Sequence, residues 1–433
     1  MSYLRTSLLT ASTLGAVFAG AGAAHAQAFY LQEQSARGAG RAFSGEVADT
    51  GAPSLWWNPA AIAGTSDAEA VVAAAAILPR SQVVDTGTLI ARPGQPFAPV
   101  GGQSESRNPI SNGVLPSGAI AIPLSDRVAF GLAVSSPYSF TTDYDSDSWA
   151  RYSADRTKLL TIDIQPSIGV ALTDWLRVGA ALNVEYTDAT LSNALPNVLA
   201  TLPDGRQELK GNGWDLGWSA GVQLHNDVVT VGIAYKSGIK HTLKGDVTIS
   251  GLVGPLAGSN GTVSDIEARF STPAQIIVGA RLKVAPRVTL NAQAVRFTWA
   301  DFDAIRLGAP LNAAIPELYR NSLSVAGGVD YEATPRLTVR AGVQRGQTPT
   351  QTGDRDARVP DSNRWNYGMG ASYKLTSRFA IDAGANYVSF EDQSIDRNTA
   401  AYVGTAAQTP ILTSGEIRNA HAVVLSLGGR VTF

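Results

Sequence analysis

The chain has 433 residues, no cysteine and a formal net charge of −2, so it carries no disulfide framework and lacks the basic excess expected of a nucleic-acid binder. Charged residues make up only 16% of the sequence, and glycine is abundant at 43 residues, whereas soluble domains usually hold ~25% charged residues. Few charges and much glycine are typical of a membrane β-barrel, in which apolar and polar residues alternate along each strand.

The N-terminus has the pattern of an export signal. Arg5 supplies a positive charge, an apolar stretch runs over roughly 8–21, and Ala24-His25-Ala26 is a small-x-small cleavage site. The apolar stretch is short for a transmembrane anchor and ends in the cleavage pattern. We therefore expect residues 1–26 to be a removed signal peptide and the exported chain to begin at Gln27.

A glycine-rich segment without strand alternation follows, over residues 27–66. The first alternating strand begins near Ala68, so the barrel is expected over 67–433. The segment carries the aromatic residues Phe29, Tyr30, Phe43, Trp56 and Trp57, which argue against a disordered tail. We expect a plug inside the lumen, because a wide barrel needs an occluder unless it is an open pore.

Short turns and long loops alternate along the rest of the chain. Six tight turns of small polar residues or proline lie at 125–128, 173–176, 226–229, 285–288, 334–337 and 376–379. Seven long segments that look irregular lie at about 79–116, 138–157, 191–212, 239–271, 300–319, 346–362 and 392–415. This alternation predicts fourteen antiparallel strands with both ends of the barrel on the side of the short turns.

The strands have one apolar and one polar face. From Leu176 to Tyr186, apolar residues alternate with a face that includes Arg177, Asn183 and Glu185. In a soluble sandwich the apolar face would meet a core, whereas in a barrel it meets lipid and the polar face lines the lumen. The export signal and the turn pattern favour the barrel. The chain ends on Phe433, a terminal aromatic residue that resembles the C-terminal signal of bacterial outer-membrane proteins, so we expect a Gram-negative-type outer membrane location.

Two motifs resemble the FadL family of outer-membrane transporters for long-chain fatty acids and aromatic hydrocarbons. The first contains Gly38-Ala39-Gly40-Arg41-Ala42-Phe43-Ser44-Gly45-Glu46 and is followed by Asn58-Pro59-Ala60. This pair is similar to the hatch that precedes the barrel in that family. The resemblance covers the whole mature chain, and it implies a fourteen-stranded barrel, working as a single copy, with an N-terminal hatch.

The second motif lies after the expected third strand. It runs from Trp149 to Ala154 and continues from Thr161 to Ser167. The family more often has Gly and Asn where this chain has Ala150 and Gln165. These departures leave the resemblance standing but weaken any statement about the exact substrate.

The resemblance implies a transport mechanism without a cofactor or metal. A hydrophobic molecule would lodge between the outer loops and enter a lumen pocket closed by the hatch. After the hatch N-terminus moves, it would leave sideways into the membrane lipid through a kink in the third strand. The kink would lie between Gly131, which offers backbone freedom, and Pro137, which cannot donate a ladder hydrogen bond. The alternative is that Pro137 simply ends the strand.

Candidate substrate contacts come from the hatch and the loops. Phe29 and Tyr30, near the mature N-terminus, are expected to touch the cargo. Leu199 and Leu202 belong to an apolar loop stretch, and ordinary loop packing is their alternative role. The other apolar residues of this loop and the next are Leu191, Leu195, Val198, Leu252, Val253 and Leu256.

Inward cations are candidates for binding a fatty-acid carboxylate. Arg281 and Arg340 are the two that we select, because a carboxylate in the lumen favours a cationic partner. The alternative is a lumen salt-bridge network. Alternation also places Arg177, Lys236, Lys283 and Lys374 inward, with Asp163, Glu185, Asp215, Asp330 and Asp382 as possible partners.

Three other functions compete with transport of hydrophobic compounds. A general diffusion porin would have an open constriction and no hatch, and a structural or adhesive barrel would show no uptake phenotype on deletion. An outer-membrane lipase or protease would need a base beside a nucleophile. His225, His241 and His421 lie in no recognisable Ser-His or Asp-His arrangement in the sequence, so we expect no catalytic residue.

Overall fold

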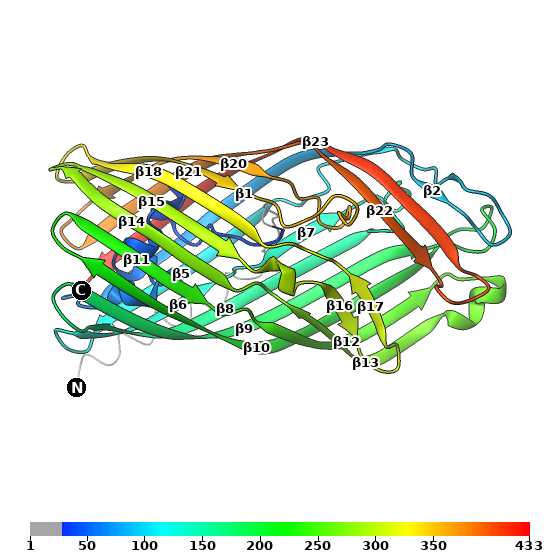
Figure 1. The fold of residues 1–433 in the computed structure, drawn as a ribbon, viewed down its shortest axis with the longest axis horizontal. Helices are drawn as coiled ribbons and strands as arrows, with labels where there is room; N and C mark the ends of the chain where they lie inside the picture. Colours follow the sequence, from blue (N-terminus) through cyan, green and yellow to red (C-terminus); the bar gives the residue numbers. More distant parts are fainter. Residues whose placement is uncertain (1–27) are drawn as a thin grey trace.

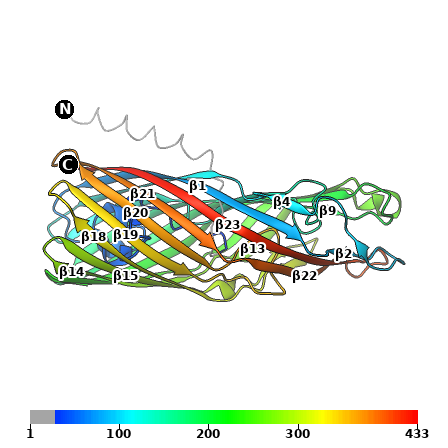
Figure 2. The same cartoon turned by 90° about the horizontal axis from the view of Figure 1, so that it is seen from above.

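A closed antiparallel barrel forms the body of the molecule (Figures 1 and 2). The computed structural model describes residues 28–433, and the predicted signal peptide 1–26 and Gln27 lie outside the described residues. The 14 predicted barrel strands are confirmed, and β23 pairs back to β1 to close the ring. In order, they are β1 (Glu69–Asp85), β5 (Gly113–Pro123), β6 (Val128–Ser135), β8 (Arg156–Ala171), β9 (Leu176–Leu195), β10 (Gly205–His225), β11 (Val229–Lys236), β14 (Gln275–Ala285), β15 (Val288–Phe297), β18 (Ser322–Glu332), β19 (Leu337–Gly346), β20 (Arg364–Lys374), β21 (Phe379–Phe390) and β23 (Thr409–Thr432).

The predicted short turns lie together at one end of the barrel, where the C-terminus is also found (Figure 1). Side chains in these turns bind nearby backbone N–H groups, as turn-forming residues do. Asn226 Oδ1, for example, accepts hydrogen bonds of 2.9 Å from both Val228 and Val229. At the same end the backbone N–H of Ala68 donates to the Phe433 carbonyl over 3.1 Å. The chain therefore begins and ends its barrel on the predicted side.

The two faces of the strands differ as alternation predicts. Leu216 and Leu427 point outward and are 65% and 62% exposed, whereas the inward Glu185 and Gln223 are 1% and 0% exposed. The exposed apolar belt is suited to lipid, and closure of the sheet pairs its first strand with its last, so that the barrel has no free outer edge. No helix among residues 28–433 is long and apolar enough to cross a membrane.

The prediction that the long connections are irregular is wrong for several of them. β9 and β10 stay paired from Leu176↔Leu224 to Leu195↔Gly205, so the hairpin continues through most of 191–212. Polar residues occupy both faces there, so the ladder continues without the apolar alternation by which strands were recognised. The additional strands are β2 (Leu89–Ile90), β3 (Ala98–Pro99), β4 (Glu105–Arg107), β7 (Ser139–Asp143), β12 (Lys240–Ser250), β13 (Gly261–Ser271), β16 (Ala304–Leu307), β17 (Ala313–Pro316) and β22 (Gln393–Ala401).

Residues 28–66, here called the N-terminal segment, lie inside the barrel toward the end with the short turns (Figure 1, dark blue). Almost every one of these residues is buried, and β1 begins directly after them at Glu69. The helical turns of the segment are α1 (Ala36–Ala39), η2 (Glu46–Ala48), η3 (Ala52–Ser54) and η4 (Pro59–Ile62), and the loops add η5 (Gly254–Ser259) and η6 (Trp299–Asp301).

Candidate binding cavity and wall opening

The N-terminal segment packs directly against glycines of the inner wall. A Cβ added to Gly179 on β9 would lie 2.3 Å from the carbonyl carbon of Pro59. One added to Gly342 on β19 would lie 2.1 Å from the carbonyl oxygen of Arg41. Only a residue without a side chain allows backbones to approach so closely. Inward-facing glycines thus mark where the segment contacts the wall. Their positions on the inward faces of the alternating strands could have been read from the sequence.

The Asn58-Pro59-Ala60 motif fastens the segment locally and to the wall. Asn58 Oδ1 accepts a 2.9 Å hydrogen bond from the Ala60 N–H and so caps η4. Pro59 occupies the first position, where a missing N–H has no cost. Asn58 Nδ2 donates to the carbonyl oxygens of Val47, at 2.8 Å, and of Val222 on β10, at 3.3 Å. One side chain therefore ties two turns of the segment to a barrel strand.

Arg41, the cation of the Gly38–Glu46 motif, is fully buried between the segment and the wall. Its guanidinium contacts Glu46, lies 2.5 Å from Asp49 and lies 3.0 Å from Asp330 on β18. Gly38 lies on α1 and Gly40 is the C-cap of that helix, directly before Arg41; a Cβ on Gly40 would lie 3.0 Å from the Gly370 Cα on β20.

The two selected cations, Arg281 and Arg340, belong to the same ionic network. Arg281 lies 3.2 Å from Asp49 and 3.0 Å from Asp330, and Arg340 Nε lies 3.5 Å from Asp330. Burial opposes ionisation of Asp49, but Arg281 and the other nearby arginines hold the pKa of Asp49 well below its usual value. The network joins the N-terminal segment to the wall, and it engages both selected cations.

The front of the segment lies in a cluster of aromatic rings. Phe29 is 5.0 Å from Trp299 and 5.4 Å from Phe302 between ring centroids, both edge-to-face. Tyr30 is 4.9 Å from Phe297 on β15 in the same type of contact. Each such ring pair contributes about 0.5–1.5 kcal/mol beyond its area burial, whereas breaking a buried ion pair typically costs about 3–5 kcal/mol. The segment is thus held by charges over its middle and by rings and hydrogen bonds at its front.

The barrel wall is interrupted in the predicted third strand. β6 ends at Ser135 and the chain resumes as β7 at Ser139, and both strands pair with β8. Ser135 lies opposite Asp163 and Ser139 lies opposite Leu160. Four steps along the interrupted strand thus match three along β8, which means that one extra residue is inserted as a bulge.

This bulge leaves an opening between β5 and the interrupted strand. Pairing of β5 with β6 stops at Gly118↔Val134, so β5 residues 113–117 have no strand partner on this side within the described chain. We call this opening, between 113–117 and 136–138, the wall gap. The break lies at Pro137, whereas Gly131 pairs regularly with Ser167. A Cβ on Gly131 would instead lie 2.7 Å from Leu55 and Ile62 of the N-terminal segment.

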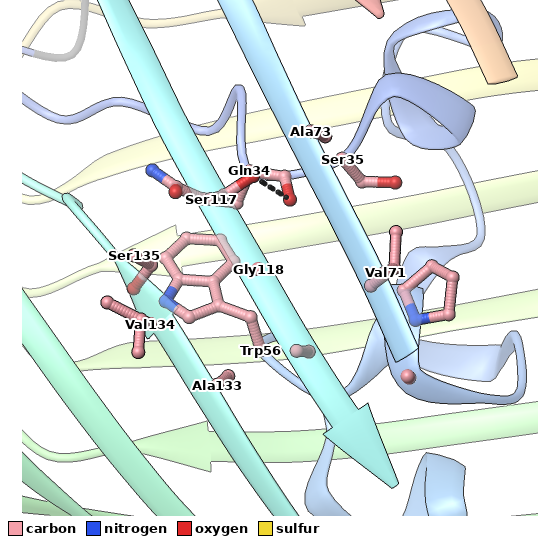
Figure 3. A pocket seen from close by; sticks show the side chains of 13 residues that line it. Gln34, Ser35, Trp56, Val71, Ala73, Ser117, Gly118, Ala133, Val134 and Ser135 are labelled. Carbon is pink, nitrogen blue, oxygen red and sulfur yellow. Dashed lines mark hydrogen bonds between the residues drawn. The ribbon is translucent and has the colours of Figure 1, made fainter. Parts of the chain in front are cut away.

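Gln34 of the N-terminal segment binds both edges of the wall gap, a role that the sequence did not suggest. Its side-chain Nε2 donates to the Ser136 carbonyl over 3.0 Å. Its backbone carbonyl accepts a 3.1 Å hydrogen bond from Ser117 Oγ on β5 (Figure 3). The backbone N–H of Leu31 donates to the Pro137 carbonyl over 2.7 Å. The segment therefore satisfies polar groups that a continuous strand would pair.

A cavity lies behind the gap, against the tip of Trp56. Its free space between the segment, β1, β5 and β6 is about 330 Å³, part of it open to solvent, and Val134 and Ser135 of β6 line it (Figure 3). Trp56 also carries the Lys236 ammonium 3.4 Å from its ring centroid.

A larger apolar cavity lies beyond Phe29, on the loop side of the N-terminal segment. Its free space is about 450 Å³, part of it open to solvent, and its apolar lining includes Phe29, Phe140, Leu159, Leu191, Phe270, Phe302, Ile305 and Val359. A second hollow shares Leu191, Phe270 and Ile305 and continues along Leu209, Leu243 and Ile266. We call the two together the apolar cavity. Its apolar lining suits a hydrophobic molecule.

The apolar loop residues predicted to contact cargo differ in how deeply they are buried. Leu195, Leu252 and Leu256 form a buried cluster, with Val198 packed against it. Leu199 is 51% exposed and lies outside that cluster, and Leu202 is half-buried. Leu199 is thus the most accessible of these apolar loop residues.

His241 has acidic neighbours that its sequence position did not reveal. Its Nδ1 lies 3.4 Å from Asp215 and its Nε2 lies 3.7 Å from Glu185, and its ring stacks on Phe270 at 4.7 Å. The two carboxylates come from β9 and β10, which are distant from His241 in sequence but adjacent to it in the lumen. Hydroxyl groups of Thr187 and Thr272 complete the contacts of the ring nitrogens.

Comparison with known proteins places the chain among outer-membrane transporters. A family model described as outer membrane protein transport protein (OMPP1/FadL/TodX) matches residues 17–433. The chain belongs to this family. It is 28% identical to a 47 kDa outer membrane protein of Pasteurella multocida, over 88% of this chain and 90% of that protein. It is also 24% identical to the long-chain fatty acid transport protein of Escherichia coli, over 83% and 86% of the two chains.

The fold of this FadL/TodX family member is also similar to a solved structure. The crystal structure of a Pseudomonas aeruginosa FadL homologue superposes with a TM-score of 0.81 at 24% identity, covering 94% of this chain and all 100% of that one. The predicted fourteen-stranded antiparallel barrel and the predicted outer-membrane location are therefore confirmed.

Proposed function

We propose that this protein takes up hydrophobic compounds passively across the outer membrane, with long-chain fatty acids as the favoured cargo. The observation that carries the proposal is the succession of an apolar cavity, a buried N-terminal segment and a gap in the barrel wall. The segment acts as a hatch in this proposal, and each barrel works alone.

Cargo first contacts the apolar surface of the outer loops, including Leu199, and then enters the apolar cavity. There it contacts Phe29, while Tyr30 lies on the hatch side of the same aromatic cluster. Transfer of an alkyl chain into such a cavity contributes ~0.8 kcal/mol per methylene. This is sufficient for capture without an energy source such as ATP.

Release requires only the front of the hatch to move. Residues from Phe29 to Gln34 are held by ring contacts and by bonds to the wall gap, whereas Arg41 and Asp49 hold the middle by charge. Displacement of Gln34 would free Ser117 and Ser136 on the two edges of the gap. Cargo then leaves sideways into the membrane and avoids the polar mouth at the other end of the lumen.

Two alternatives predict different transport behaviour. An aromatic hydrocarbon would also suit a cavity lined by Phe29, Phe140, Phe270 and Phe302. A general diffusion porin would need a water-filled path, and the buried N-terminal segment opposes it.

Uptake by whole cells tests this proposal. We expect cells that contain the protein to accumulate labelled dodecanoate faster than cells that lack it, because the barrel adds a path for this compound across the outer membrane. Toluene is measured in parallel: faster uptake of toluene alone would assign the aromatic cargo. An unchanged rate for both compounds would remove the transport function.

A further inference from the structure

Trp56 is the one aromatic residue among residues 28–433 that lines the cavity behind the wall gap. Its indole is 4% exposed and extends from the N-terminal segment toward Val134 and Ser135 of β6 (Figure 3). The other residues of this lining are small, aliphatic or polar. The indole is therefore the bulkiest side chain between the lumen and the wall gap.

The backbone on both sides of Trp56 is hydrogen-bonded to the barrel. The Leu55 carbonyl accepts a 3.2 Å hydrogen bond from Gln165 Nε2 on β8. Asn58, two residues after Trp56, donates to a carbonyl of β10 over 3.3 Å. Gln34 differs, because it belongs to the front of the segment, which rings and hydrogen bonds hold without the ionic network. We therefore expect Trp56 to stay in place when Gln34 moves away from the wall gap.

The ring of Trp56 has two further partners that fix its orientation. The Lys236 ammonium on β11 lies 3.4 Å from the centroid of the indole ring. Trp57 packs edge-to-face against the same indole, with 4.8 Å between the ring centroids. Lys236 is 7% exposed, and within the described chain no carboxylate oxygen lies within 4.0 Å of its ammonium. A buried ammonium without an ion-pair partner is attracted to the face of an aromatic ring, so Lys236 favours the observed orientation of the indole.

We propose that Trp56 is a specificity-determining residue of the exit and that its ring, positioned by Lys236, limits the width of the cargo that leaves through the wall gap. This rests on the proposed function and adds a limit on its substrates. In that function Gln34 forms the side of the exit that moves, whereas Trp56 forms the side that stays. Close-packed protein yields little to a group that is too wide, so a single alkyl chain passes the indole and a large fused ring system does not.

Uptake of narrow and wide compounds by whole cells tests this assignment. Dodecanoate is the narrow compound, naphthalene is wider and pyrene is wider still, and uptake by cells without the protein is subtracted. We expect Trp56→Ala to raise the ratio of pyrene uptake to dodecanoate uptake about 10-fold, the effect of a small steric misfit in a hydrophobic site. The ratio for naphthalene should rise less. Trp56 is absent from the described lining of the apolar cavity, so its replacement changes the exit and not the capture of cargo.

Two controls separate the width of the exit from leakage through the lumen. Trp214→Ala removes an indole that points outward from β10 and is 60% exposed, and it should keep the wild-type ratio. The single-channel conductance of Trp56→Ala should match the wild type, because Arg41 and its partners still hold the segment. If the conductance rises, Trp56→Phe decides, because it keeps an aromatic ring in the segment and should raise the pyrene ratio by a smaller factor at wild-type conductance.

Lys236 is tested as a positioning residue. Lys236→Met should raise the pyrene ratio, because the indole loses the cation on its face, whereas Lys236→Arg keeps a cation there and should keep the ratio. Adding Lys236→Met to Trp56→Ala should raise the ratio no further, because Lys236 acts through the ring. An unchanged ratio in Lys236→Met overturns the positioning role.

A pyrene ratio that stays at the wild-type value in both Trp56→Ala and Trp56→Phe overturns the width assignment. Uptake of dodecanoate by wild-type cells would then still support the proposed function. Uptake of none of the compounds by wild-type cells would remove both proposals.

Discussion

Replacement of Arg41 by methionine is expected to loosen the N-terminal segment and to let ions through the lumen. The buried guanidinium is the common partner of Glu46, Asp49 and Asp330, so its loss leaves carboxylates buried with fewer cations. Breaking a buried pair by removing one partner typically costs about 3–5 kcal/mol. Arg281 still contacts Asp49 and Asp330, so the segment should loosen while the strand ladder of the barrel persists.

Hydrogen exchange and single-channel conductance report this change. Amides over residues 36–63 should exchange faster in Arg41→Met, and a planar bilayer should show a larger conductance than with the wild type. Arg336→Met, which changes an exposed arginine in a short turn, serves as the matched control and should match the wild type. If Arg41→Met keeps both wild-type exchange and wild-type conductance, the ionic network does not hold the segment.

Deletion of Pro137 is expected to close the wall gap and to stop uptake. The interrupted strand has one residue more than β8 requires between Ser135 and Ser139. Removal of one residue restores a one-to-one pairing register with β8, which would let β6 and β7 join as one strand. Cargo could then still enter the apolar cavity but would find no lateral exit, so dodecanoate uptake should fall to the level of cells without the protein.

The control for this deletion is Pro137→Ala, which keeps the extra residue and therefore the bulge. We expect it to retain most of the uptake, because the inserted residue and not the proline ring causes the gap. Binding of dodecanoate to the purified deletion variant should match the wild type. Normal uptake by the deletion variant, at equal protein level in the outer membrane, would show that cargo leaves by another route.

The strand framework was readable from the sequence because local chemistry specifies it. Turns such as the one at Asn226 are closed by their own side chains, and lipid on one side with lumen on the other imposes strict alternation. The same rule failed in the outer hairpins. There Arg206, Glu208 and Lys210 continue a β10 strand that has no lipid-facing side.

The candidate site was less predictable because long-range pairing determines it. Arg41 and Asp330 are 289 residues apart, so nothing near either residue indicates the other. Val359 lies in a segment expected to be an irregular loop, and only the closed barrel brings it to Phe29. The position of the break, by contrast, could be predicted in part from the sequence, because Pro137 indicated an interruption. The extra residue is evident only from the register with β8.

Photo-crosslinking with a fatty acid that carries a diazirine at its chain end tests the proposed path most directly. After brief loading of cells and illumination, modified peptides are located by mass spectrometry. Lateral release predicts adducts around Phe29 in the cavity and around Ser117 and Ser136 at the wall gap. Adducts at Arg37, Arg177 and Thr432, which line the polar mouth below the segment, with none at the gap, would contradict the account.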